Sequence, residues 1–253
     1  MRILCSNDDG TGAAGLEVLE TLAKDLTDDV WVVAPETDQS GVSHAVSLNN
    51  PLRLRQISEK HYAVKGTPVD CVVTGVRYLL DTPPQLVLSG VNRGQNLAED
   101  VRYSGTMAAA MEATIMGIPA IAVSQSYGEK GRSKIHWDCA LRHGGSVLRR
   151  LLEFGIPKDT LINLNFPDCK PDDVQGIAIA PQGRRGEAMI RLEERMDGRE
   201  KPYYWVCFDR SGVHPAENTD LWAIERNWIT VTPIQLDMTD WKTMKKLAEH
   251  FNQ

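Results

Sequence analysis

The sequence predicts an α/β fold built on an open, mostly parallel sheet. Residues Ile3 to Ser6 form a short apolar run of the kind found in buried strands, and residues 30–34 form a second. Between them, Leu16, Leu19 and Leu22 recur at helical spacing. A strand, a helix and a second strand in this order imply a parallel pair joined by a right-handed crossover.

The same alternation continues along the chain after one interruption. Residues 42–64 contain short extended pieces in which apolar and polar residues alternate, and they predict a half-exposed hairpin, a β-rich insertion. The periodicity then predicts a helix near 69–80, a strand at 86–89, a helix at 106–116, a strand at 120–124, a helix around 141–152, a strand at 161–164, a strand at 229–234 and a final helix around 241–251.

Residues 183–218 depart from this pattern. They are polar and irregular around an extended stretch at 203–208, which is compatible with a lid, a small β-subdomain or an oligomerisation arm. With 253 residues and 42% apolar content, the chain is otherwise long enough for one α/β domain spanning 1–253.

Charge and cysteine content exclude several classes of protein. A formal net charge of −6 disfavours a protein that grips a nucleic-acid polymer, although a local site can still bind a small phosphate. No apolar run is long enough for a membrane span, and the short opening run does not resemble a signal peptide. The five cysteines are scattered without a Cys-x-x-Cys pair, so we expect reduced thiols in a cytoplasmic protein.

Two adjacent carboxylates, Asp8 and Asp9, follow the first predicted strand. Unit charges about 4 Å apart repel by roughly 4 kcal/mol at an effective dielectric constant near 20, and a divalent cation reverses that sign. Oxygen ligands suit Mg²⁺, Mn²⁺ or Ca²⁺. Alternatively, Asp8-Asp9-Gly10 is a solvated turn. Ligands of open α/β sheets bind beyond the carboxyl ends of strands, and this position favours a site.

Three more loops follow predicted strand ends. Residues 90–100 carry Asn92 and Asn96 among glycines and are suited to an anion or to a further metal ligand, and an eleven-residue connection is long for such folds. Ser104, Gly105 and Thr106 precede a predicted helix, whose first N–H groups favour a phosphate, although an ordinary helix cap has the same composition. Ser40 follows the second strand, where its hydroxyl can complete a metal shell or stand in a simple turn.

Other polar residues have simpler interpretations. The six histidines show no metal-binding spacing, and Arg184-Arg185 is expected in a solvated turn or facing an anionic substrate. No Gly-x-Gly-x-x-Gly follows the first strand, which argues against a dinucleotide-binding oxidoreductase.

Taken together, these segments resemble the SurE family of 5'-nucleotidases. The resemblance is carried, in chain order, by Ser6-Asn7-Asp8-Asp9-Gly10, Val33-Ala34-Pro35, Ser40-Gly41, Gly66-Thr67-Pro68-Val69-Asp70-Cys71-Val72, Ser89-Gly90-Val91-Asn92-Arg93-Gly94-Gln95-Asn96, Asp100-Val101-Arg102-Tyr103-Ser104-Gly105-Thr106 and Thr219-Asp220. The resemblance is weak in 127–135 and 183–212, and Ala14, Ala98 and Asn218 depart from the usual family residues.

The resemblance implies a Rossmann-like, three-layer core and hydrolysis of nucleoside 5'-monophosphates to nucleoside and phosphate. It implies one divalent metal ion, Mg²⁺ or Mn²⁺ and in a crystal Ca²⁺, held by Asp8, Asp9, Ser40 and Asn92. It also implies phosphate binding by Asn96, Ser104, Gly105 and Thr106, and homodimers or homotetramers in which C-terminal segments exchange.

We therefore expect a metal-dependent phosphomonoesterase with Asp8 and Asp9 as catalytic residues. Asp8 is the candidate for activating water, and a covalent aspartyl-phosphate is the competing route. The rival functions are a non-catalytic nucleotide sensor and a metal-dependent nucleotide-sugar transferase.

Overall fold

The structure is a computed structural model that describes residues 1–128, 135–186, 190–208 and 214–252. Within these ranges, nine strands form one sheet in the order β3-β4-β2-β1-β5-β6-β7-β11-β8. The strands of this sheet are β1 Arg2–Ser6, β2 Asp29–Pro35, β3 Arg53–Ser58, β4 His61–Lys65, β5 Leu86–Arg93, β6 Ala120–Gln125, β7 Thr160–Phe166, β8 Gly176–Ile179 and β11 Trp228–Gln235. Most neighbours pair in parallel, and the antiparallel pairs are β3 with β4 and β7 with β11.

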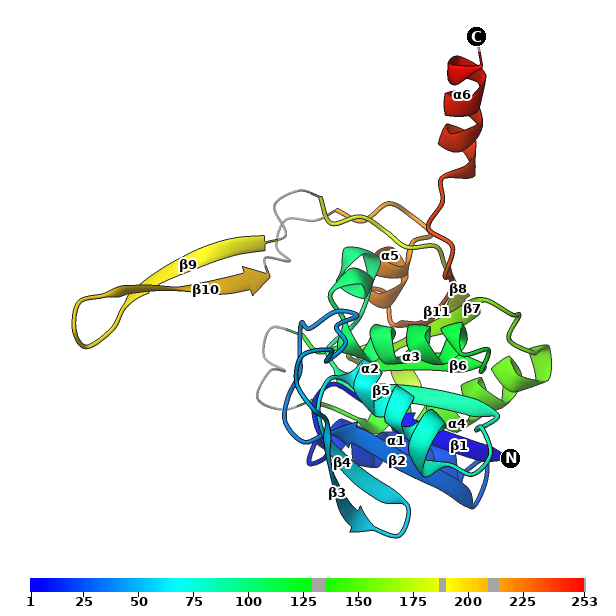
Figure 1. The fold of residues 1–253 in the computed structure, drawn as a ribbon. Helices are drawn as coiled ribbons and strands as arrows, with labels where there is room; N and C mark the ends of the chain where they lie inside the picture. Colours follow the sequence, from blue (N-terminus) through cyan, green and yellow to red (C-terminus); the bar gives the residue numbers. More distant parts are fainter. Residues whose placement is uncertain (129–134, 187–189, 209–213, 253) are drawn as a thin grey trace.

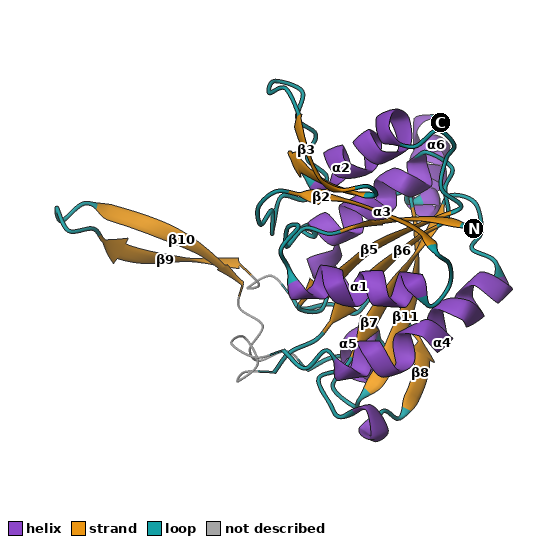
Figure 2. Cartoon of the chain, turned by 90° about the horizontal axis from the view of Figure 1, so that it is seen from below, coloured by secondary structure: helices purple, strands orange, loops and turns teal. Residues whose placement is uncertain are grey.

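Helices cover both faces of this sheet, as Figure 2 shows. The helical elements are α1 Ala14–Lys24, α2 Pro68–Thr74 with its π-helical continuation η1 Gly75–Leu79, η2 Ala98–Arg102, α3 Gly105–Ile115, α4 Asp138–Phe154, η4 Pro171–Asp173, α5 Asp220–Ile224 and α6 Trp241–Phe251. The Rossmann-like three-layer arrangement is thereby confirmed.

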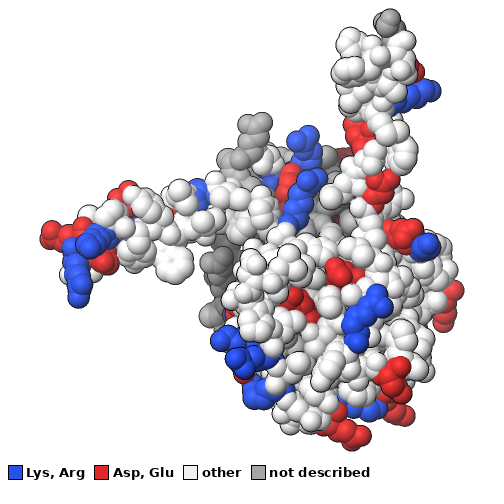
Figure 3. Space-filling model, in the orientation of Figure 1, with Lys and Arg blue, Asp and Glu red and all other residues white. Residues whose placement is uncertain are grey.

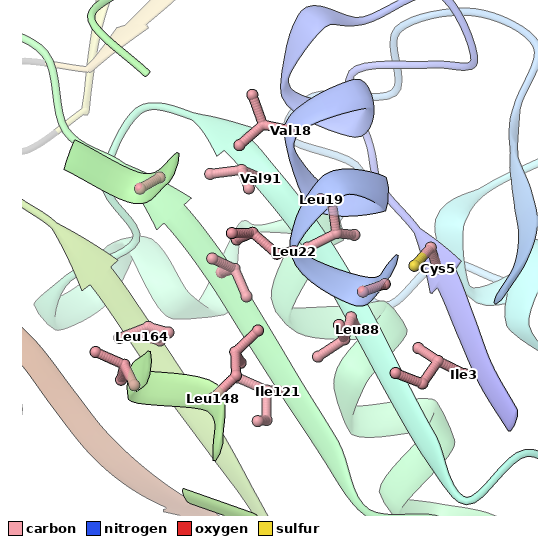
Figure 4. Close-up of a cluster of buried hydrophobic side chains, with 14 of the residues drawn as sticks. Ile3, Cys5, Val18, Leu19, Leu22, Leu88, Val91, Ile121, Leu148 and Leu164 are labelled. Atoms are coloured by element: carbon pink, nitrogen blue, oxygen red, sulfur yellow. The ribbon is translucent and has the colours of Figure 1, made fainter. Parts of the chain in front are cut away.

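Successive side chains of the central strands point to opposite faces of the sheet, and this divides the core into two layers. Ile3 and Cys5 of β1 point to the face covered by α1 and α4, whereas Leu4 points to the face covered by α2 and α3. Figure 4 shows Leu19 and Leu22 of α1 above strand residues such as Leu88. Burying each such leucine contributes roughly 1.5–3 kcal/mol, which is what holds the ends of the strands in fixed positions.

The predicted hairpin at 42–64 is present but is part of the main sheet. Strand β4 pairs in parallel with β2, and β3 continues the sheet as its edge. The hairpin therefore extends the sheet, and the sequence did not indicate this because all six β3 residues are exposed.

The predicted eleven-residue loop at 90–100 was wrong. Strand β5 continues to Arg93, and η2 begins at Ala98. The pairing register of β5 with β6 shifts between Ser89 and Asn92, as at a β-bulge, and Gly90 adopts a positive φ of 139° there. A Cβ at position 90 would lie 2.1 Å from the Val123 carbonyl oxygen. Bulges redirect side chains near sites, and this one places Asn92 at the strand end.

The segment 183–218 is less irregular than expected. Strands β9 Ile190–Met196 and β10 Pro202–Phe208 form an antiparallel hairpin, hereafter the arm, which projects away from the sheet in Figure 1. Helix α6 also projects from the body (Figure 1). The expectations for 129–134, 187–189 and 209–213 concern residues outside the described ranges. Within those ranges, no helix has both the length and the apolar character needed to cross a membrane.

Candidate active site at the strand ends

A cavity of about 940 Å³ lies beyond the carboxyl ends of β1, β2 and β5. The parallel pairing of β1 with both β2 and β5 brings these three ends together. Six of the eight predicted site residues line the cavity: Asp8, Asp9, Ser40, Asn92, Asn96 and Ser104. The other two, Gly105 and Thr106, are buried at the start of α3 directly after Ser104.

Asp8 carries an electrostatic cost that a bound cation would relieve. Its side chain is buried, and the Thr106 hydroxyl donates a hydrogen bond to its Oδ1. Burial, reinforced by repulsion from Asp9, raises the pKa of Asp8 to about 7. The pKa of Asp9 is also raised by burial, although the backbone N–H of Arg93 donates to its Oδ2 at 3.0 Å. Two carboxylates that resist ionisation side by side favour either a bound proton or a cation.

This arrangement predicts that the metal-free protein loses stability as pH rises. The folded state holds the Asp8 proton more tightly than the unfolded chain, where the ordinary pKa is 3.8. Stability should therefore fall between about pH 4 and pH 7 and then level off, by about 1.4 kcal/mol for each unit of the shift. Thermal unfolding in chelator should show this slope for the wild type, whereas Asp8→Asn should flatten it and be the more stable protein at pH 8. An identical dependence of stability on pH in the wild type and in Asp8→Asn would contradict the assignment of the raised pKa to Asp8.

Asn92 and Ser40 are oriented as neutral oxygen ligands. The Asn92 side-chain amide donates to the Gly94 carbonyl at 2.7 Å, and this leaves its Oδ1 for a cation. The Ser40 hydroxyl donates to Asp38 Oδ1 at 2.6 Å, so its oxygen lone pairs stay accessible. Asp8 also anchors the Ser40 loop, because its carbonyl accepts a 2.7 Å hydrogen bond from the Gln39 N–H.

The start of α3 lies against Asp8. Ser104 is the N-cap and accepts a hydrogen bond from the Met107 N–H, so its own hydroxyl hydrogen is free to point at a ligand. A Cβ at Gly105 would lie 2.8 Å from the Asp8 Cβ and 3.0 Å from Pro68 Cγ. Glycine at this position therefore allows the positive end of the helix to approach the carboxylate pair closely.

Asn96 is held by a buried amide network that the sequence analysis missed. Its N–H donates to Asn165 Oδ1 at 2.8 Å, its side-chain amide donates to Ser124 at 3.0 Å, and its carbonyl accepts from Asn163 at 2.7 Å. Asn163 and Asn165 sit in the otherwise apolar strand β7 and are almost fully buried. Alternation of Asn with Leu at 161–165 was the available signal, because polar residues in a buried strand require partners.

The expectation that Arg185 faces an anionic substrate stays a prediction, but the expected solvated turn was wrong for Arg185. Its side chain is only 6% exposed and forms a 2.9 Å ion pair with Asp100, which lines the cavity. Its backbone N–H also donates to Glu99. The neighbouring Asp220 is fully buried and accepts the backbone N–H groups of Ala98 and Gly183 at 2.9 and 2.7 Å. The Thr219-Asp220 motif thus fixes η2, which leads into Tyr103 and Ser104.

We expect Arg185→Ala to destabilise the fold by about 3 kcal/mol, because it removes the cation from the buried ion pair with Asp100. Urea unfolding should show the loss, and the exposed neighbour provides a matched control in Arg184→Ala, which should stay within about 0.5 kcal/mol of the wild type. Equal stability of the two variants would show that the buried pair contributes nothing.

The fold and the site together define a class of protein. An open Rossmann-like sheet presents paired carboxylates and neutral oxygens at its strand ends, opposite the N-terminus of a helix. This combination is typical of α/β proteins that bind a phosphate group together with a divalent cation.

Comparison with known proteins gives the family. The family model described as Survival protein SurE matches residues 3–189. The 5'-nucleotidase SurE of Methylobacterium radiotolerans is 58% identical over 252 residues, 99% of each chain. That of Methylocella silvestris is 57% identical over 250 residues, 98% of this chain and 99% of the relative. The crystal structure of the SurE protein from Aquifex aeolicus matches with a TM-score of 0.85 at 38% identity over 100% of both chains. The chain belongs to the SurE family.

Proposed function

We propose that this protein is a metal-dependent phosphomonoesterase that hydrolyses nucleoside 5'-monophosphates to nucleoside and phosphate. The observation that carries the proposal is the buried Asp8 beside Asp9, directly against the start of α3 at the edge of one cavity. Full-length similarity to relatives named 5'-nucleotidase SurE supports the same activity. The cavity is large enough for a nucleotide, since ligand sites commonly span about 300–1,000 Å³.

The residues at the strand ends fit a divalent cation. Asp8 and Asp9 offer carboxylate oxygens whose mutual repulsion a cation would relieve, and Ser40 and Asn92 offer neutral oxygens. Among the described residues, no group of three or more His, Cys, Asp or Glu side chains is placed to hold a metal, so this mixed oxygen set is the one we assign. Such ligands suit Mg²⁺ or Mn²⁺, and Ca²⁺ can take the same place in a crystal. When bound, the ion supplies positive charge that draws in the phosphate and stabilises the charge developing on it.

The protein's own groups position the phosphate and move the proton. Ser104 and the first N–H groups of α3, at Gly105 and Thr106, bind phosphate oxygens, and the remaining N–H of the Asn96 side-chain amide binds another. These donors are fixed before substrate arrives, so they stabilise the transition state without reorganising. Asp8 accepts the proton of the attacking water at its carboxylate, while the Thr106 hydroxyl keeps that carboxylate oriented. As the bond from phosphorus to the nucleoside 5'-oxygen breaks, that oxygen takes up a proton from solvent and leaves as the nucleoside hydroxyl.

A phosphate-release assay tests the function. A panel of nucleoside 5'-monophosphates should be hydrolysed in Mn²⁺ or Mg²⁺ and should not be hydrolysed in chelator. Tight nucleotide binding without phosphate release would identify a sensor, and release only in the presence of a sugar acceptor would identify a transferase. Acid-quenching with labelled substrate distinguishes direct attack by water from a covalent aspartyl-phosphate intermediate. A phosphorylated Asp8 would exclude direct attack by water.

We also propose that the protein forms homodimers or homotetramers through the arm and α6. Exposed apolar side chains on these two projections are Leu192, Tyr204, Trp205, Val206, Trp241, Met244, Leu247 and Phe251. In Figure 3 the charged groups of the arm gather at its tip, and much of the remaining arm surface is uncharged. Apolar surface of this extent on a projecting segment marks an interaction site.

Light scattering on the eluting protein tests the assembly. Leu247 is 52% exposed on α6, and Leu247→Asp places a charge in the proposed contact, so it should lower the mass of the main species to a smaller assembly. Lys245→Asp changes the charge of the same helix by two units and serves as the control. A wild-type chain that elutes as a monomer would contradict the proposal.

A further inference from the structure

Three aromatic residues line the same cavity but have no role in the chemistry described above. Tyr103, Tyr127 and Phe208, hereafter the aromatic rim, join the carboxylates and Ser104 in lining it. They come from three separated parts of the chain: the end of η2, the segment after β6 and the end of β10 in the arm. Their convergence on one cavity is a product of the fold and not of local sequence.

Contacts within the rim hold two of these rings in place. The Tyr103 and Phe208 rings meet edge to face, with centroids 5.4 Å apart and an angle of 65° between their planes. The backbone of Tyr103 is fixed on both sides, since its N–H donates to the Asp100 carbonyl and its carbonyl accepts from the Ser43 N–H. The two side chains nonetheless remain 37% and 38% exposed, so the pair presents aromatic surface that no residue covers completely.

The third ring, that of Tyr127, packs against Gly94. A Cβ at Gly94 would lie 3.0 Å from Tyr127 Cε1, so the ring packs directly against the chain between β5 and Asn96. The rim therefore has one part next to the phosphate-binding turn, at Tyr103, and another next to the Asn92–Asn96 segment, at Tyr127. Tyr103 and Ser104 line the same cavity, so a phosphate ester bound at Ser104 shares that cavity with the Tyr103 ring.

We propose that Tyr103 and Phe208 form the surface on which the nucleobase of the substrate stacks. This inference rests on the proposed nucleotidase function and names the part of the site that recognises the organic portion of the substrate. Aromatic rings bind the flat face of every base, so the site should accept purines and pyrimidines alike, with purines favoured by their larger area. Because Phe208 belongs to the arm, the arm contributes directly to substrate recognition.

Comparing a nucleotide with the same phosphoester lacking its base tests this assignment. In Phe208→Ala and Phe208→Leu, kcat/KM for AMP should fall about tenfold, the size of one lost base–aromatic stack, chiefly through KM. The value for ribose 5-phosphate should stay unchanged, and Phe208→Trp should restore AMP hydrolysis. Tyr78→Ala is the control, since Tyr78 is an aromatic residue of η1 that is 76% exposed, does not line the cavity and lies outside the proposed subunit contact.

Each outcome decides the inference. Equal losses on AMP and ribose 5-phosphate, or a loss in Tyr78→Ala as large as in Phe208→Ala, would overturn the stacking role and leave the nucleotidase function standing. Wild-type protein that releases no phosphate from any nucleotide in Mn²⁺ would overturn both.

Discussion

Asp8→Asn should lower the rate of phosphate release by about 10³-fold, the largest effect we expect from a single substitution. The variant keeps the size of the side chain and can still accept the Thr106 hydrogen bond. It removes one of the two negative charges that attract the cation and the group that takes the proton from water. The measurement is phosphate release from AMP at saturating Mn²⁺.

Asp172→Asn provides the control for this substitution, because Asp172 is an exposed carboxylate in η4 and does not line the cavity. It should retain wild-type activity. Asp8→Asn protein that is folded and keeps more than about a tenth of the wild-type rate would show that this carboxylate is not part of the chemistry.

Gly105→Ala should lower activity by about 10²-fold, the cost of moving catalytic groups by about 1 Å. The added methyl group would lie 2.8 Å from Asp8 Cβ and 3.2 Å from Asp8 Oδ2, so either the start of α3 or Asp8 must shift. Because the substitution neither adds nor removes a charge, the loss of activity reports only the changed distance between Asp8 and the start of α3. It should appear mainly in kcat when phosphate release is measured over a range of AMP concentrations.

Gly12→Ala is the matched control, since nothing lies within 4 Å of a Cβ at that position in the loop after β1. Comparable activity of Gly105→Ala and Gly12→Ala would mean that the close approach of α3 to Asp8 has no catalytic value.

Much of the fold was predictable from the sequence because its core elements are regular. The central strands are short apolar runs, and α1 places its leucines at helical spacing, so packing and periodicity agree. The arm could not be predicted in the same way. In β9 nearly every residue is exposed, and without a buried face a strand has no apolar alternation to reveal it. The role of β4 in the central sheet depends on parallel pairing with a distant strand, which local sequence does not encode.

Some residues of the candidate site could likewise be predicted from the sequence and others could not. Asp8 and Asp9 could be found because they follow a strand at the edge where open sheets bind ligands. Asn92 was selected as a candidate for a partly wrong reason, since residues 90–93 of the segment taken for a loop belong to a bulged strand whose glycine mimics loop composition. The network of Asn163 and Asn165 escaped notice because it joins β7 to Asn96, which lies far away in the sequence. Phe208 escaped for the same reason, since only the folded chain brings it to Tyr103.

Anomalous diffraction from crystals soaked in MnCl₂ tests the central claim most directly, because it locates the ion without assuming any activity. We predict a manganese peak at the end of β1, within bonding distance of Asp8 and Asp9 and next to Ser40 and Asn92, and no such peak in crystals of Asp9→Asn protein. A wild-type crystal with no manganese at this position, from protein whose phosphate release is unaffected by chelator, would contradict the account.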